Sequence, residues 1–160
     1  MWFAGFCAKE GETSNERVKS MVPIPIIWLW ELAESEGIIV EWYPQENYPL
    51  GRYCYADGLS FIFLNPVIQE SSKLYRCTFA HELGHYYATV AGMPGDDELA
   101  LKWARRIVLP DSWVLPRRHM NPARLAEEAD VYEEWVAARI RDIWNRLSGR
   151  FCALKGDVKC

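Results

Sequence analysis

The stretch TFAHELGHYYATV, residues 78–90, holds two of the three histidines of the chain, four positions apart, with a glutamate directly after the first. Residues four apart on an α-helix lie on one face, so His81 and His85 can direct both imidazole rings at one metal ion. Glu82 is poorly placed to bind the same ion, but it can reach a water molecule beside it and act as a general base. The pattern therefore predicts a zinc hydrolase site; the alternative is an ordinary helix with two buried histidines.

The sequence around this pattern favours a helix. We expect it to begin at Ser71 or Ser72 and to continue to about Val90, before the helix-ending Gly92. Gly84, inside the helix, leaves space for a neighbouring segment to pack closely. One face carries five residues at helical spacing: Leu74, Thr78, His81, His85 and Ala88. The histidine pair thus lies in the structural context that a metal-binding helix requires.

A third metal ligand has to come from elsewhere in the chain, because a catalytic zinc site uses three protein ligands and leaves one position open for water. The five cysteines form no CxxC pair and His119 is the one remaining histidine, so we expect a carboxylate. Asp96, Asp97 and Glu98 open the next predicted helix. Asp97 is in phase with the apolar face of that helix, whereas Glu98 is in phase with its charged face. We therefore predict Asp97 as the ligand, with Glu98 as the alternate.

The elements before the histidine helix are one helix and three short strands. A helix over residues 25–36 is expected to end at Gly37, and Asp57-Gly58 is a typical hairpin turn. The predicted strands are IIVEWY (38–43), GRYCY (51–55) and LSFIFLNP (59–66). We expect them to form a small antiparallel sheet packed on the histidine helix.

Helices dominate the chain after the histidine pattern. Residues 96–109 predict a helix that stops before Pro110, and residues 121–147 predict two helices or one bent helix. Strands followed by a run of helices are typical of an α+β domain, not of alternating βαβ units. The expected organisation is a lead-in at 1–20, a metalloprotease-like core at 21–112, and a helical module at 113–160 packed on that core.

Composition restricts the possible classes of protein. With 160 residues, half of them apolar, the chain is long enough to fold around its own core. Its net charge of −4 disfavours general binding to nucleic acid. An odd number of cysteines disfavours a disulfide framework and favours a reducing cytoplasm. The absence of an apolar run of about 18 residues or of a typical secretion signal disfavours membrane insertion and export.

The chain resembles the ImmA/IrrE family of metallo-endopeptidases, bacterial and phage-encoded proteases that act on transcriptional repressors. The similarity covers roughly residues 22–142 and rests on three stretches: HELGHYY, LALKWARRIVLP with an acidic residue before it, and VYEEWVAARI. Counted back from the stop at Val108-Leu109-Pro110, the acidic ligand of the family falls on Asp97, with Ala100 in the place of the family's alanine. The family usually has Glu at the ligand position, and often Asn or Asp where this chain has Leu101.

This resemblance implies a zincin-like fold, a zinc cofactor and the hydrolysis of peptide bonds. Glu82 would take a proton from the attacking water and pass it to the leaving amine. The implied substrate is a helix-turn-helix repressor, and the C-terminal helical part would itself be helix-turn-helix-like. The strand at 59–66 is expected either to be an edge strand that pairs with the substrate or to be a plain core strand. Four residues are candidates for a second group that stabilises the oxyanion: His119, Tyr132, Tyr87 and Tyr53.

The distribution of charge suggests another class of function. Residues 1–100 hold 6 of the 18 Lys and Arg and 14 of the 22 Asp and Glu, which leaves 12 basic and 8 acidic residues for 101–160. The basic part contains Arg117, Arg118, Arg124, Arg139, Arg141, Arg146 and Arg150, interrupted by four glutamates. A DNA-binding or toxin–antitoxin regulatory protein that retains a zinc site is therefore the alternative, although direct contact with nucleic acid is not expected.

Overall fold

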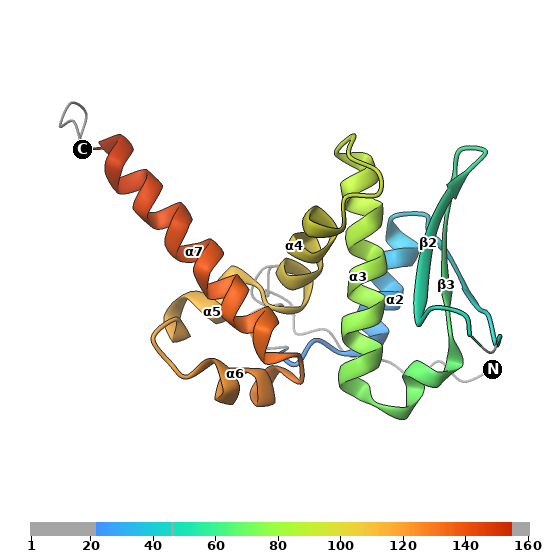
Figure 1. Cartoon of the computed structure of the whole chain (residues 1–160), viewed down its shortest axis with the longest axis horizontal. Helices are drawn as coiled ribbons and strands as arrows, with labels where there is room; N and C mark the ends of the chain where they lie inside the picture. Colours follow the sequence, from blue (N-terminus) through green and yellow to red (C-terminus); the bar gives the residue numbers. More distant parts are fainter. Residues whose placement is uncertain (1–21, 46, 155–160) are drawn as a thin grey trace, which may run out of the picture.

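The computed structural model describes residues 22–45 and 47–154, so the predicted lead-in at 1–20 lies outside the described residues. The fold is mixed α+β, as predicted (Figure 1). Its elements are α2 (Ile26–Ser35), β1 (Ile39–Trp42), β2 (Gly51–Ala56), β3 (Leu59–Leu64), the 3-10 helix η1 (Pro66–Glu70), α3 (Ser72–Val90), α4 (Asp97–Val108), α5 (Asp111–Arg117), α6 (Pro122–Ala129) and α7 (Glu133–Leu154).

The sheet has the strand order β1-β3-β2 and is mixed, so the prediction of an antiparallel sheet is wrong for one pair. β2 pairs antiparallel with β3, but β1 pairs parallel with β3. The reason is that β3 is the most apolar strand and takes the centre, where Ile62 and Leu64 are fully buried. Because successive strands reverse direction, β1 and β3 point the same way. Of the two alternatives for residues 59–66, the edge strand is wrong and the core strand is confirmed for Leu59–Leu64, since β3 is central and β2 is an edge strand.

The turn between β2 and β3 is the one that the sequence predicts. Asp57 and Gly58 have φ angles of 52° and 81°, and two successive positive φ angles define the type I′ hairpin turn. Asp and Gly adopt this conformation at low cost, which fixes the register between β2 and β3.

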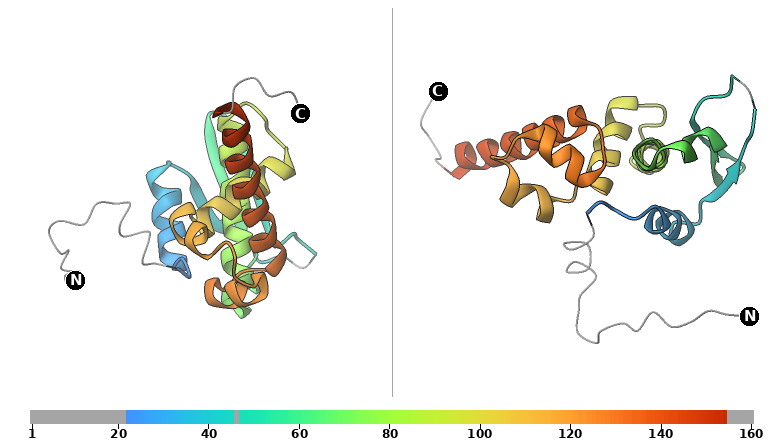
Figure 2. Two further views of the ribbon diagram at one scale, coloured as in Figure 1. Left: turned by 90° about the vertical axis from the view of Figure 1, so that its left-hand side faces the viewer. Right: turned by 90° about the horizontal axis from the view of Figure 1, so that it is seen from below.

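Helix α3 lies between two hydrophobic cores. The sheet-side core joins α3 to α2 and the sheet through Ile24, Leu29, Ala33, Ile38, Ile62, Leu64, Ile68, Phe79 and Leu83. The helix-side core joins the other face of α3 to α4, α5, α6 and α7 through Cys77, Ala80, Ala104, Val108, Leu109, Trp113, Val114, Leu125, Ala126, Ala129, Val131, Trp135, Val136 and Ile143. Seen end-on, α3 lies between the sheet with α2 and the C-terminal helices (Figure 2).

The C-terminal part contains two helices in the predicted range 121–147 and one helix that the sequence did not predict. Residues 121–147 form α6 and α7, separated at Asp130, which has a φ angle of 49°. The segment between α4 and α6, which is rich in proline and arginine, forms the short helix α5, because Trp113 and Val114 are buried in the helix-side core. Within the described ranges, every helix is too short or too polar to cross a membrane.

Candidate metal centre

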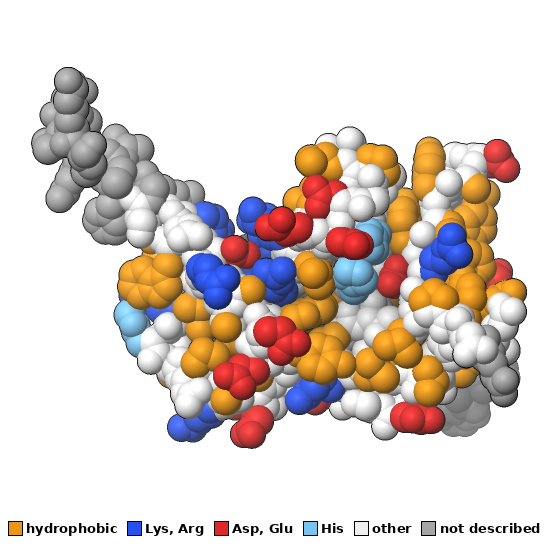
Figure 3. Space-filling model, in the orientation of Figure 1, with side chains coloured by type: hydrophobic (Ala, Val, Ile, Leu, Met, Phe, Trp, Pro, Cys, Tyr) orange, Lys and Arg blue, Asp and Glu red, His pale blue; other side chains and the backbone are white. Residues whose placement is uncertain are grey.

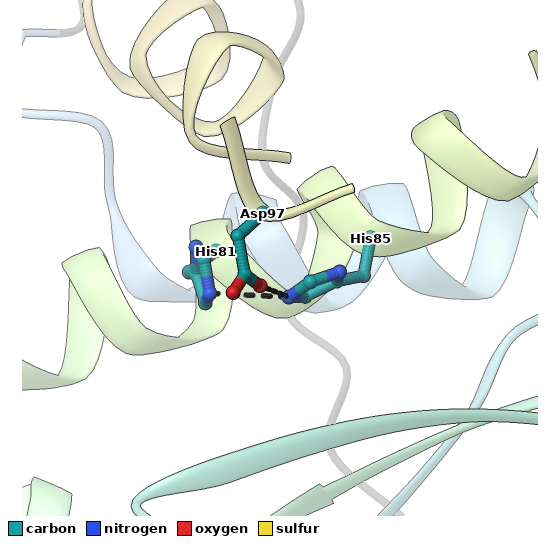
Figure 4. A group of neighbouring side chains, drawn as sticks. All are labelled: His81, His85 and Asp97. Atoms are coloured by element: carbon teal, nitrogen blue, oxygen red, sulfur yellow. Dashed lines mark hydrogen bonds and ion pairs between the residues drawn. The ribbon is translucent and has the colours of Figure 1, made fainter. Parts of the chain in front are cut away.

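His81 and His85 stand on one face of α3 and direct their Nε2 atoms toward the same point (Figure 4). These two nitrogens are 3.2 Å apart. The Oδ1 atom of Asp97, at the start of α4, is 3.2 Å from Nε2 of His85. One ligand atom from each of the three residues lies within 4.8 Å of the other two. The structure therefore brings together the three residues that the sequence predicts as metal ligands.

The spacing of these atoms fits a zinc ion. Tetrahedral bonds of about 2.0–2.2 Å place neighbouring ligand atoms about 3.3–3.6 Å apart, close to the two separations of 3.2 Å. Burial lowers the pKa of His81, and the charge of His85 lowers it further against the opposing effect of Asp97. A neutral imidazole offers the lone pair that a metal needs. The Nδ1 atom of His81 is buried without a hydrogen-bond partner among the described residues, so packing holds this ring in place.

The start of α4 distinguishes the three candidate acids. Asp96 caps the helix, since its Oδ1 accepts a hydrogen bond of 2.8 Å from the N–H of Leu99. Asp97, the first helical residue, reaches His85, whereas Glu98 is exposed and lies outside the cluster. The side chain of Asp97 is itself 81% exposed. The expectation that it faces the core with the apolar side of α4 is therefore wrong, because Asp97 is the first residue of the helix and lies beyond its buried positions Ala100, Ala104 and Val108.

Gly84 brings α4 close to the histidine helix. A Cβ atom at Gly84 would lie 2.1 Å from the carbonyl oxygen of Ala100, which is far inside contact distance. The prediction that this glycine leaves space for a neighbouring segment is confirmed, and α4 is that segment. The close crossing of α3 and α4 allows a side chain as short as Asp97 to reach His85.

Glu82 lies on the sheet side of the same site and is only 5% exposed. Burial raises its pKa to about 7, although the N–H of Tyr53 donates a hydrogen bond to it and opposes the shift. Strand β2 passes directly over this side chain, since a Cβ atom at Gly51 would lie 2.7 Å from Cγ of Glu82. A carboxyl group with a pKa near neutrality can both accept and donate a proton at physiological pH.

A cleft of about 1070 Å³ runs along α3 and is lined by His81, Glu82 and His85. Its walls are β2, the turn at residues 92–95 and the start of α7. Figure 3 shows histidine side chains beside an acidic one at a hollow between the strands and the helices. Because β2 is an edge strand that lines the cleft, its backbone offers hydrogen-bonding groups near the histidines.

The four candidates for a second oxyanion group separate into two pairs. Tyr53 and Tyr132 line the cleft. The hydroxyl of Tyr87 instead donates a hydrogen bond of 3.0 Å to Glu36, and His119 packs against an exposed tryptophan of α7. Tyr53 and Tyr132 are thus the candidates that line the cleft, and the hydroxyl of Tyr53 lies 3.2 Å from Oγ of Ser60.

Sequence reasoning missed three residues that shape the site: Gly51, Cys77 and Trp135. A glycine in a strand often marks a close approach of backbone, so Gly51 carried a signal that could have been read. Cys77 and Trp135 line the cleft from separate helices and had no such signal. Comparison with protein-family models, with curated proteins and with solved structures found no match for this chain. The similarity to the ImmA/IrrE family thus stays a prediction from the sequence.

Proposed function

We propose that this protein is a zinc-dependent endopeptidase with a zincin-like core, in which His81, His85 and Asp97 hold the metal. The observation that carries the proposal is the convergence of three ligand atoms, at separations suited to tetrahedral zinc, beside a buried carboxyl group in an open cleft. Two histidines alone are common in helices, but this combination is typical of a hydrolytic site.

The chain's own residues supply the proton transfers. When bound, zinc acts as a Lewis acid toward water and a carbonyl group. Glu82 accepts the proton of the attacking water and donates it to the leaving amine, while the N–H of Tyr53 holds its carboxylate. An extended peptide pairs with the backbone of β2, which aligns it along α3. Tyr53 or Tyr132 donates a hydrogen bond to the developing oxyanion.

The proposed substrate is a helix-turn-helix repressor in the cytoplasm. The acidic N-terminal part, which forms most of the cleft, suits a basic DNA-binding protein. The helix-turn-helix-like C-terminal part would dock elsewhere on the same substrate. Both contacts involve exposed charges, so we expect association to weaken with salt.

A DNA-binding or toxin–antitoxin regulatory role is the second candidate, favoured by the basic C-terminal part. Three of its arginines are in ion pairs. Arg139 and Arg146 bind Asp111, and Arg124 pairs with Glu128. Arginines committed to such contacts are less available to phosphate groups, which supports the protease proposal over this one.

The metal proposal is tested by elemental analysis of the purified protein. We expect about one equivalent of zinc in the wild type, as a three-ligand site holds it, and its loss in His81→Ala. Asp97→Ala should lose zinc, and Glu98→Ala, its neighbour, is the matched control that should keep it. Wild-type protein without metal, or His81→Ala with full metal content, would refute the proposal.

The catalytic proposal is tested with Glu82→Gln, which keeps the size of the side chain but cannot accept a proton. We expect normal zinc content and cleavage at least ~100-fold slower, the usual scale for loss of a general base. Equal activity in the wild type and the variant would remove Glu82 from the mechanism.

The substrate proposal is tested by incubation with the helix-turn-helix repressor encoded nearest to this protein's gene, at low and high salt. One discrete cleavage, weaker at high salt and absent in Glu82→Gln, is expected. A gel-shift assay with promoter DNA should show no specific complex. Specific DNA binding without proteolysis would instead support the regulatory alternative.

A further inference from the structure

Resting on the proposed function, we infer that the end of the cleft at the start of α7 binds a large apolar side chain of the substrate, about two residues from the bond that is cut. This α7 pocket is formed by Leu50 just before β2, Leu74 and Cys77 of α3, Tyr132 just before α7, and Trp135 in the first turn of α7. The protein would accordingly select its cleavage site by an apolar residue and not by a charged one.

The chemistry of the lining supports this choice. The five residues of the α7 pocket have no charged side chain, and burial raises the pKa of the Cys77 thiol to about 11, which keeps it neutral. Arg52 lines the same cleft, but its side chain is exposed to solvent. Arg76, next to Cys77 in the chain, is paired with Asp130 at 2.5 Å. A charged substrate side chain would therefore lose its hydration here without gaining a counter-ion. An apolar side chain gains free energy from burial in the same place.

The position of the pocket sets its distance from the cleaved bond. Cys77 precedes His81 by about one helical turn, which is about 6 Å along α3. In an extended peptide neighbouring residues are about 3.3 Å apart, so about 6 Å corresponds to about two residues. A peptide whose carbonyl group lies at the histidine cluster therefore places over Cys77 a side chain about two residues from that carbonyl group.

The opposite end of the cleft is different. Beyond His85 its helix side is lined by the small residues Thr89, Gly92, Pro94 and Gly95, and its strand side carries Tyr55, which is 61% exposed. This end offers a side chain one largely exposed ring, in place of the buried Cys77 and Trp135 of the α7 pocket. Selectivity is thus expected on one side of the cleaved bond.

The C-terminal helices contribute a wall of this pocket. Trp135 is 8% exposed and packs edge-to-face on Tyr132, with ring centroids 6.4 Å apart. Arg76 of α3 holds this corner through the carboxylate and the carbonyl oxygen of Asp130. The start of α7 is therefore part of the catalytic cleft, in addition to any separate role in docking.

Three small hydroxamates that bind zinc can test the pocket without measuring catalysis. Acetohydroxamate reports on the metal alone, 3-phenylpropanehydroxamate adds an apolar arm, and the monohydroxamate of succinic acid adds a charged arm. We expect calorimetry on the zinc-loaded protein to show at least ~10-fold tighter binding of the phenyl compound than of acetohydroxamate, in line with the burial of a phenyl group. The succinic compound should bind no more tightly than acetohydroxamate.

Two variants locate the effect. Cys77→Leu fills the pocket and Leu74→Ala removes part of its wall, so both should reduce the phenyl advantage at least ~5-fold while acetohydroxamate binds as before. Thr89→Leu, at the opposite end, is the matched control and should keep the advantage. Wild-type protein that binds acetohydroxamate but shows no preference for the phenyl compound would overturn the pocket and leave the zinc proposal intact. Failure to bind any hydroxamate would overturn both.

Discussion

The two sides of α3 prepare different parts of the site. On the sheet side, β2 covers Glu82, and the N–H of Tyr53 in this strand donates a hydrogen bond to the Glu82 carboxylate. On the helix side, the close crossing at Gly84 brings Asp97 to the histidines. The proton acceptor thus depends on the sheet, and the third metal ligand depends on the helices. Metal binding and proton transfer should therefore be separable by mutations on opposite sides of one helix.

The largest effect is expected where the two sides are joined. Arg76 is 5% exposed; it donates to the carbonyl oxygen of Ile24 in the sheet-side core and to Asp130 on the helix side. Arg76→Ala would leave these acceptors without a donor, and we expect the free energy of unfolding to fall by about 3 kcal/mol. Urea denaturation measures it. Arg124→Ala, which breaks an exposed pair with Glu128, is the control and should cost under about 0.5 kcal/mol.

If Arg76→Ala and Arg124→Ala lost similar stability, Arg76 would not join the two sides. If Arg76→Ala caused a large loss of stability and Asp130→Asn caused part of that loss, the effect would come from the Arg76–Asp130 pair and not only from the volume of the arginine side chain.

The next largest effect is expected on the helix side, where a mutation should weaken metal binding. Gly84→Ala places a methyl group against backbone of α4, which cannot rotate away. Helix propensity favours Ala by about 1 kcal/mol, but overpacking of this kind typically costs about 1–3 kcal/mol, so we expect a net loss of stability. We also expect at least ~10-fold weaker zinc binding, measured by competition with a chelator, because α4 must move. Unchanged affinity would show that Asp97 does not depend on this crossing.

The corresponding change on the sheet side is Gly51→Ala. Its methyl group would meet Cγ and Oε1 of Glu82 and Cγ2 of Thr78 at 2.7–2.9 Å. These are side-chain atoms that can move, so stability should change little, but the proton acceptor is displaced. We expect proteolysis to fall at least ~10-fold, since small displacements of catalytic groups are costly, while zinc content stays at the wild-type level. Loss of zinc together with activity would contradict the separation of the two sides.

Local signals in the sequence predicted much of this arrangement, because they depend on residues close together in the chain. Ser71 caps α3, Asp57 and Gly58 form the hairpin turn, and helical phase favoured Asp97 over Glu98. The strand order depends instead on which strand is buried most deeply, which is a property of the whole fold. Local signals therefore predicted neither the parallel pairing of β1 nor the edge position of β2. Helix α5 was missed for the same reason, since buried Trp113 stabilises it against the local preference of Pro116.

The smallest expected effect is a loss of stability at acid pH, and it should come from the helix side. All ion pairs found within residues 22–45 and 47–148 involve this side, among them the bonds of Arg146 and Arg139 to Asp111. Burial alone would raise the pKa of Asp111, but the hydrogen bond from Arg146 and the charges of Arg139 and Arg146 outweigh it, so the pKa is lowered. A carboxyl group with a lowered pKa in the folded state stabilises the protein above its unfolded pKa of about 3.9.

This stabilisation should be lost as the pH falls through the lowered pKa of Asp111. We therefore expect Asp111→Asn to be less stable than the wild type at pH 7, by no more than about 1 kcal/mol because the side chain is 48% exposed, and the two proteins to converge below about pH 3. Urea denaturation between pH 7 and pH 2.5, with a chelator present to remove the metal contribution, measures the difference. Arg146→Met removes the side chain that donates hydrogen bonds to both oxygens of the same carboxylate and should reduce the acid dependence in the same range. A stability difference between Asp111→Asn and the wild type that stays constant down to pH 2.5 would show that the arginines do not lower the pKa of Asp111, and that the helix side is no more sensitive to acid than the sheet side.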